Sequence, residues 1–306
     1  MAEFEYQVLD VFTDTALAGN PLAIVFGARQ LDTQMMQRIA REFNLSETVF
    51  VLPPENKAHR ARIRIFTPDY ELPFAGHPTV GSAVALAALD GIDTGIFVLE
   101  ENIGLLRCAV SKQGPTSFAE FDLPVLPKPV PFTADAETVA AALGLDPQDI
   151  GFEHHRISAW TAGVPYVAVP VRDVAAAARV TFNNDAWMRI APGKGEGPKG
   201  EGLVASAYVY TREAVGHEVS YHVRMFVPGV PSYEDPATGS AAAAFSGLIV
   251  HFDKPLDGSS QLWIEQGMEM VRPSRIRLEI ELEQGRLRAA RIGGNAVKIA
   301  EGTLRV

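Results

Sequence analysis

Two segments of this chain are rich in alanine and other small residues and have no polar face. The first, at residues 79–89, reads T-V-G-S-A-V-A-L-A-A-L and follows a His-Pro step, and the second, at 234–245, reads E-D-P-A-T-G-S-A-A-A-A-F. A helix that is apolar on all sides must be enclosed by other elements. We therefore expect a buried helix in each half of the chain, with a sheet wrapped around the first.

The surroundings of these segments also repeat, which indicates an internal duplication rather than a short-period solenoid. His77-Pro78-x-x-Gly81-Ser82-Ala83 matches Asp235-Pro236-x-x-Gly239-Ser240-Ala241. Phe66-x-Pro68 matches Phe226-x-Pro228, and the turn at 18–21 has a rough echo at 162–165.

The length of 306 residues exceeds one ordinary core and predicts two domains. We assign residues 1–122 to the first, with a terminal strand at 296–306 as a candidate addition to it, and 132–295 to the second. The proline-rich segment 123–131 is the expected linker, with little capacity for regular pairing. Residues 192–202 are rich in glycine and lysine and are expected to form a surface loop.

Hydrophobic patterning places further elements along the chain. Helices are expected at 33–43, capped by Asp32, and at 135–144, closed by Gly144. Strands are expected at 4–12, 22–26, 48–52, 61–66, 95–100, 105–111 and 219–226.

Charge and composition exclude several classes of partner and site. The formal net charge of −10 disfavours nucleic acid and anionic membranes. Cys108 is the sole cysteine, so no intrachain disulfide and no cysteine-based metal site can form. The N-terminus lacks a signal-peptide pattern, and no apolar run approaches the ~20 residues of a membrane helix. We expect a cytoplasmic location.

The starts of the two apolar helices are candidate anion sites, because N-terminal N–H groups lack intrahelical partners and carry partial positive charge. Two such ends facing one cleft would receive a carboxylate or a developing enolate. Gly81 and Gly239 would allow close backbone approach, and Thr238 and Ser240 would add hydroxyl donors. Two structural alternatives remain: Asp235 as a helix N-cap only, and His77 as a buried structural histidine.

Glu47 is the candidate acid–base residue. It follows a helix end and begins an apolar strand, where partial desolvation would raise its pKa toward neutrality. The position alone is a weak signal, because most glutamates at strand ends are solvated.

Four motifs together resemble the phenazine-biosynthesis-F-like (PhzF-like) family and, more distantly, diaminopimelate epimerase. They are V-x-D-V-F-T-D-x-x-x-x-G-N-P-L-A-I-V (8–25), L-S-E-T-V-F-V (45–51), F-x-P-x-x-E-L-P-F-A-G-H-P-T-x-G-S-A (66–83) and D-P-A-T-G-S-A (235–241). The segment G-G-N-A-V (293–297), expected to head the last strand, fits the same pattern. The resemblance spans essentially the whole chain.

The resemblance implies an α+β fold of two similar, pseudo-symmetric domains, each a curved, mostly antiparallel sheet around a central helix, with the active site between them. It implies a cofactor-independent isomerase without a metal, and a homodimer. The family's acid–base glutamate falls on Glu47, its histidine on His77 and its aspartate on Asp235.

The resemblance also guides the assignment of substrate-binding positions. Carboxylate-binding groups fall on Gly239 and Ser240, and Gly76 lies beside His77. We assign Thr238, Asn20 and Ser46 to substrate binding as well. Cys108 lies in neither motif, which excludes the two-cysteine mechanism of the distant epimerase relatives.

Two other patterns are rejected. Gly195-x-Gly197-x-x-Gly200 spells a dinucleotide motif but lacks the required strand and helix. The adjacent His154 and His155 are expected to be a surface pair that points apart, without a third metal ligand.

The sequence therefore predicts an isomerase that moves a proton on a small carboxylate-bearing substrate. A two-base epimerase or racemase using Glu47 and Asp235, and a non-catalytic protein that binds a small acid, remain alternatives.

Overall fold

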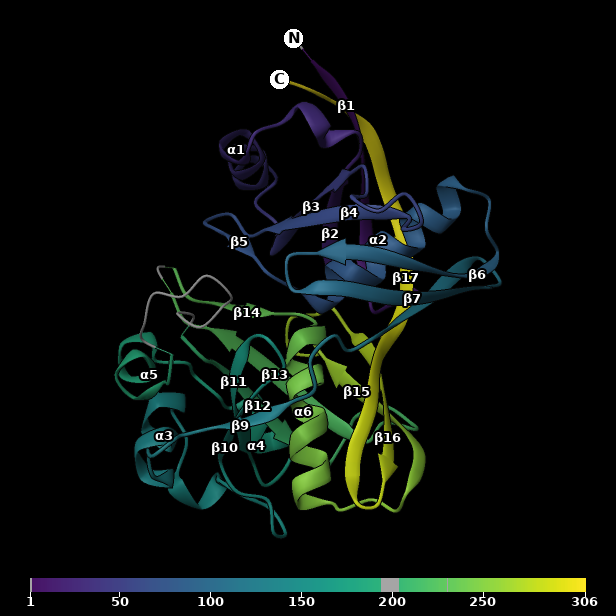
Figure 1. Cartoon of the computed structure of the whole chain (residues 1–306). Coiled ribbons are helices and arrows are strands. Elements are labelled where there is room, and N and C mark those ends of the chain that lie inside the picture. The colour runs from purple at the N-terminus through teal and green to yellow at the C-terminus, as the bar shows by residue number, and fades with distance from the viewer. Residues whose placement is uncertain (1, 194–203, 230) are drawn as a thin grey trace. The chain divides into compact units, whose positions relative to one another are not determined.

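The computed structural model describes residues 2–193, 204–229 and 231–306. It divides into two compact units, one formed by Met1–Pro124 with Ile292–Val306 and the other by Val125–Arg291 (Figure 1). Most of the predicted 192–202 loop, and the rejected glycine motif at 195–200, lie outside the described residues.

The first unit is built from strands and two α-helices. Its elements are β1 (Glu3–Val11), β2 (Asn20–Val25), η1 (Ala28–Gln30), α1 (Thr33–Phe43), β3 (Glu47–Leu52), β4 (Ala61–Phe66), β5 (Glu71–Leu72), α2 (Gly76–Leu89), β6 (Thr94–Glu101), β7 (Gly104–Gln113) and β8 (Thr116–Asp122).

The second unit contains more helices. Its elements are β9 (Lys128–Val130), α3 (Ala136–Leu143), η2 (Pro147–Asp149), β10 (Ser158–Thr161), β11 (Pro165–Pro170), α4 (Val174–Ala178), α5 (Asn184–Ile190), β12 (Ser206–Thr211), β13 (Tyr221–Val227), β14 (Tyr233–Asp235), α6 (Gly239–Phe252), β15 (Gly258–Gln266) and β16 (Ser274–Glu283). The last strand, β17 (Arg286–Arg305), begins in this unit and ends in the first.

Strand pairing follows the same order in both units. In the first, β2–β3 and β4–β6 are parallel, while β1–β2, β3–β4, β4–β5 and β6–β7 are antiparallel. In the second, β11–β12 and β13–β15 are parallel, while β10–β11, β12–β13, β13–β14 and β15–β16 are antiparallel. The strands are thus mixed but mainly antiparallel in each unit.

The two apolar helices are enclosed as their composition predicts. Residues 76–87 of α2 are all buried, and α2 packs on β1, β2, β3, β7 and β8 (Figure 1). Residues 239–249 of α6 are all buried, and α6 packs on β9, β10, β11 and β16. The small alanine side chains let the surrounding strands approach closely. Because the strands then cover the helix on all sides, no face of it meets water and none has to be polar.

Three details differ from the sequence predictions. Part of the expected linker is a strand, because Lys128–Val130 pairs with β10, and a short edge strand tolerates Pro129. Residues 293–297 do not head the last strand but lie inside β17. The close approach at Gly81 is to the sheet, since a Cβ there would lie 2.6 Å from Leu22 Cδ2 and 2.8 Å from Val11 Cγ2.

No helix among the described residues is long and apolar enough to cross a membrane.

Candidate active site

In the first unit, Glu47, His77 and Asn20 come together from three elements. Glu47 is the first residue of β3, His77 the second residue of α2, and Asn20 the first residue of β2. His77 Nε2 lies 3.3 Å from Glu47 Oε2, and Asn20 Nδ2 lies 3.3 Å from His77 Nδ1. The side chain of Glu47 is 13% exposed, so this carboxyl group is largely desolvated, as predicted.

Backbone geometry determines where Asn20 and Glu47 begin their strands. Gly19, directly before Asn20, has a φ of +65°, and a Cβ there would lie 2.3 Å from Val11 O, so only glycine fits this turn. Asn44, the C-cap of α1, also adopts a left-handed conformation and ends the helix three residues before Glu47. Ser46, which is half-buried, completes this short connection.

His77 is electrically neutral. Burial lowers the pKa of its imidazole to about 3, since the charged form would have to leave water. Because the Asn20 amide donates to Nδ1, the ring proton resides on Nε2, which faces the Glu47 carboxyl group. The pair is therefore a carboxyl group beside a neutral N–H donor, rather than an ion pair.

Tyr70, between β4 and β5, is a neighbour of Glu47 that sequence reasoning missed. Burial first, and then the negative charges of Glu47 and Asp69, raise the pKa of its phenol. The residue is nevertheless 43% exposed. Tyr70 occupies an unspecified position of the 66–83 motif, so the pattern gave no signal for it.

In the second unit, Asp235 and Thr238 are held by Gln266. The Thr238 hydroxyl donates to Asp235 Oδ2 at 2.5 Å. Gln266 Oε1 accepts from Thr238 N at 3.1 Å, while its Nε2 donates to Asp235 O at 2.7 Å and to Thr238 Oγ1 at 3.0 Å. Sequence reasoning missed Gln266, because it lies 28 residues away on β15.

These bonds correct two expectations. The N–H and hydroxyl of Thr238 are already engaged, so they are not open donors for a substrate carboxylate. The N-cap of α6 is Thr238, so Asp235 is not a capping residue. First-turn N–H groups at Gly239 and Ser240 have no acceptor within the helix, as at any helix start.

Ser240 is the second residue of α6, and its hydroxyl lies 2.7 Å from the hydroxyl of Tyr166 on β11. Both side chains are buried. This bond sets the direction of the Ser240 hydroxyl at the helix start. Tyr166 is another residue that the sequence gave no reason to select.

The helix starts align the two halves five residues away from the predicted match of Gly81 with Gly239. Both buried helices are 14 residues long and begin at a glycine, Gly76 and Gly239, so His77 and Ser240 are each the second residue of their helix. Strand register agrees, because Glu71 pairs with Phe66 as Glu234 pairs with Phe226. Leu72 lies four residues before α2 as Asp235 lies four residues before α6, and Pro78 is the third residue of α2.

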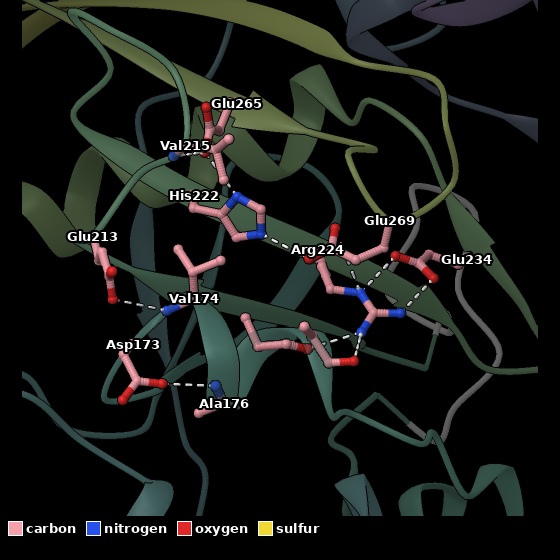
Figure 2. Close-up of polar contacts among 12 residues, drawn as sticks. Asp173, Val174, Ala176, Glu213, Val215, His222, Arg224, Glu234, Glu265 and Glu269 are labelled. Carbon is pink, nitrogen blue, oxygen red and sulfur yellow. Dashed lines mark hydrogen bonds and ion pairs between the residues drawn. The ribbon is translucent and has the colours of Figure 1, made fainter.

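A buried charge network supports the strand that carries Asp235. The Arg224 guanidinium binds both oxygens of Glu234 at 2.8 Å, and Glu234 directly precedes Asp235 (Figure 2). His222, on the same strand as Arg224, lies between Glu265 at 2.8 Å and Glu269 at 2.9 Å. Hydrogen bonds to these two carboxylates outweigh the burial of the imidazole and raise the pKa of His222 to about 9.

His154 and His155 differ from the predicted surface pair. His155 is fully buried, and Asp253 brings a third possible ligand atom within 4.8 Å. Existing contacts already occupy these groups: Arg212 Nη2 donates to Asp253 Oδ1 at 2.6 Å and lies 3.2 Å from His155 Nε2. A cation would have to displace this guanidinium, so the arrangement is a hydrogen-bonded charge network.

A family profile described as phenazine biosynthesis-like protein matches residues 9–302. The chain belongs to the phenazine biosynthesis-like (PhzF) family. An uncharacterized isomerase of Mesorhizobium japonicum is 63% identical over 300 residues, which cover 98% of each chain. The trans-2,3-dihydro-3-hydroxyanthranilate isomerase of Pseudomonas aeruginosa is 35% identical, with 97% of this chain and 98% of the relative covered.

Solved structures agree with this assignment. A PhzF-family phenazine biosynthesis protein of Bacillus anthracis has a TM-score of 0.87 and 27% identity, with both chains fully covered. A hydroxyproline epimerase from Agrobacterium vitis has a TM-score of 0.62 and 12% identity, covering 99% of this chain and 92% of the other, and shows the epimerase-like fold alone. As a PhzF-family member with named isomerase relatives, the chain is an isomerase.

Proposed function

We propose that this isomerase moves a proton on a small carboxylate-bearing substrate, with Glu47 as the acid–base residue and no cofactor. The contact between Glu47 and His77 carries the proposal. A largely desolvated carboxyl group suits proton transfer near neutral pH, and the neutral Nε2–H donor beside it can orient the carboxylate without a permanent countercharge.

The second unit supplies the substrate-binding groups in this proposal. The first-turn N–H groups at Gly239 and Ser240, with the Ser240 hydroxyl directed by Tyr166, would bind the substrate carboxylate. Asp235 would return or receive a proton. Its carboxyl group already accepts the hydroxyl of Thr238.

We also propose that the two units are pseudo-symmetric copies. Their shared pairing order supports this, as do two matched side-chain contacts. Arg64 binds both oxygens of Glu71 and lies over Phe66, as Arg224 binds both oxygens of Glu234 and lies over Phe226. The domain limits, the homodimer and the cytoplasmic location stay predictions.

Solvent deuterium uptake tests the function. The relative from P. aeruginosa is named for trans-2,3-dihydro-3-hydroxyanthranilate, so that compound is the first probe, followed by a panel of small amino and aromatic acids selected by thermal stabilisation. We expect uptake of one deuteron at carbon in the probe that binds. Binding of every selected acid without exchange would support the non-catalytic alternative, and a change of chirality in the product would indicate the two-base epimerase.

A further inference from the structure

The turn between β6 and β7 holds the segment that leads into α2. Asn102 Nδ2 donates to Glu71 Oε1 at 2.8 Å, and Ile103 N donates to Pro73 O at 3.0 Å. Glu101, the last residue of β6, contacts α2 itself, with Oε1 2.7 Å from Thr79 Oγ1. Three consecutive residues thus bind β5, the β5–α2 connection and the first turn of α2, the helix on which His77 lies.

If Glu101 were ionised, the single hydroxyl proton of Thr79 would face two acceptors. Thr79 Oγ1 lies 2.8 Å from Ala75 O and 2.7 Å from Glu101 Oε1, and a carbonyl and an ionised carboxylate are both acceptors only. One hydroxyl proton cannot serve both at full strength. Both contacts are satisfied if Thr79 donates to Ala75 O and Glu101 is protonated and donates to Thr79.

The surroundings of Glu101 also disfavour its charge. The residue is 8% exposed, and Oε2 has no hydrogen-bond partner among the described residues. Burial raises the pKa of this carboxyl group to about 8, against a smaller opposing effect of the Thr79 hydroxyl. Leaving an ionised oxygen buried without a donor would be more costly than keeping the proton.

The second unit places a permanently neutral side chain at the matching position. In the parallel strand pairs, Arg62 lies opposite Glu100 as His222 lies opposite Glu265, so Glu101 corresponds to Gln266. Gln266 donates from Nε2 to Thr238 Oγ1 at the start of α6. A protonated glutamate has the same shape as glutamine and also carries a donor.

We propose that Glu101 is a neutral carboxylic acid that donates to Thr79 and thereby acts as a positioning residue for His77. The bonds from Thr79 to Ala75 O close the first turn of α2, and His77 lies within that turn. Ionisation of Glu101 would turn a donor into a second acceptor and loosen the turn. The protonation of Glu101 is independent of the proposed function, whereas its effect on catalysis through His77 rests on that function.

The neighbouring titratable groups do not replace this proton. On β7, the buried Cys108 thiol has a pKa well above its usual range, raised by burial and then by Glu101 and by Asp122 of β8, so it stays neutral. His77 on α2 is neutral as well. On β6 itself, the carboxyl group of Glu100 accepts hydrogen bonds from the backbone N–H groups of Glu55 and Asn56. The positive charge of Arg62 on β4 is paired with Glu55.

Amide hydrogen exchange across pH tests the proposal, with Glu101→Gln as the isosteric variant. After correction for intrinsic exchange, protection of peptides within residues 74–82 should fall in the wild type by about tenfold per pH unit between about 5 and 8, then level off. Glu101→Gln should keep its protection and lose this slope. The reciprocal Gln266→Glu chain should acquire a slope in peptides within residues 235–242.

Infrared spectroscopy supplies a second readout. The difference spectrum between wild type and Glu101→Gln should contain a protonated-carboxyl band at pH 6 that disappears by pH 10. A missing band at pH 6, or an equal slope in both proteins, would overturn the proposal. If the wild type loses deuterium uptake into the substrate probe above pH 8 and Glu101→Gln does not, the proton on Glu101 is required for the reaction. If no probe exchanges in any variant, the proposed function fails while the spectra still decide the state of Glu101.

Discussion

Glu47 Oε2 lies 3.3 Å from His77 Nε2, although the imidazole is neutral and the contact is therefore not an ion pair. An imidazolium there would form a stable salt bridge with the carboxylate and hinder its protonation. A neutral N–H group can donate to an oxygen of Glu47 whether the carboxyl group is ionised or protonated. This suits a residue that must accept and release one proton.

The neutral state of His77 predicts an acid-side loss of stability. The pKa is near 6.5 in the unfolded chain and about 3 in the native one, so below pH 6.5 the unfolded state binds the extra proton. The free energy of unfolding should fall by about 2 kcal/mol between pH 6.5 and pH 5 from this group alone. Urea unfolding of wild type and His77→Gln measures it, and parallel curves for the two proteins would contradict the assignment.

His222 predicts the opposite trend at alkaline pH. Its native pKa of about 9 exceeds the unfolded value, so its contribution is complete below pH 6.5 and lost as the pH rises through 9. We expect about 3 kcal/mol of stability lost from this group between these limits. In His222→Gln the alkaline slope should be shallower. An unchanged slope would show that the two carboxylates do not hold a proton on His222.

The bond between Thr238 and Asp235 is testable with a matched pair of substitutions. Thr238→Val removes the hydroxyl that donates to Asp235 and accepts from Gln266, whereas Thr238→Ser retains it. Leaving a buried carboxyl oxygen without this donor predicts a destabilisation of about 2 kcal/mol for valine. Serine should cost much less. Equal unfolding midpoints for the two variants would mean that this hydroxyl does not stabilise Asp235.

Cys108 should be dispensable for the reaction. Cys108 is fully buried in β7. The native protein should resist a thiol reagent that reacts on unfolding, and Cys108→Ala should keep the exchange rate within about twofold, because we assign it no proton-transfer role. A loss of exchange with folding intact would reopen a thiol mechanism.

Local elements were readily predicted, whereas side-chain partners were not. Helix 33–43 and strand 61–66 match their predicted bounds, and Asp32 caps its helix by accepting from Met35 N. These features depend on hydrophobic period and on residues within one turn. The helix starts are contacted by side chains from distant strands, namely those of Gln266, Tyr166 and Glu101. A local sequence pattern cannot predict contacts between residues so far apart in the sequence.

The repeated motif illustrates the same limit. Matching the letters G-S-A aligned Gly81 with Gly239, but Gly81 lies inside α2, where its missing side chain admits β1 and β2. Strand register gives a different match from the letters, because register is a property of paired backbones rather than of motif spelling. His77 and Asp235 both lie near a helix start, but His77 is the second residue of α2 whereas Asp235 lies four residues before α6.

The most direct test of the central claim compares solvent deuterium uptake by Glu47→Gln with that of the wild type, using a probe that both proteins bind. Glu42→Gln, at an exposed position of α1, serves as the control for loss of a carboxylate five residues away in the sequence. We predict that uptake falls by at least about a thousandfold in Glu47→Gln, with probe affinity within a few fold, and is unchanged in Glu42→Gln. Uptake by Glu47→Gln at the wild-type rate would contradict the assignment of Glu47 as the acid–base residue.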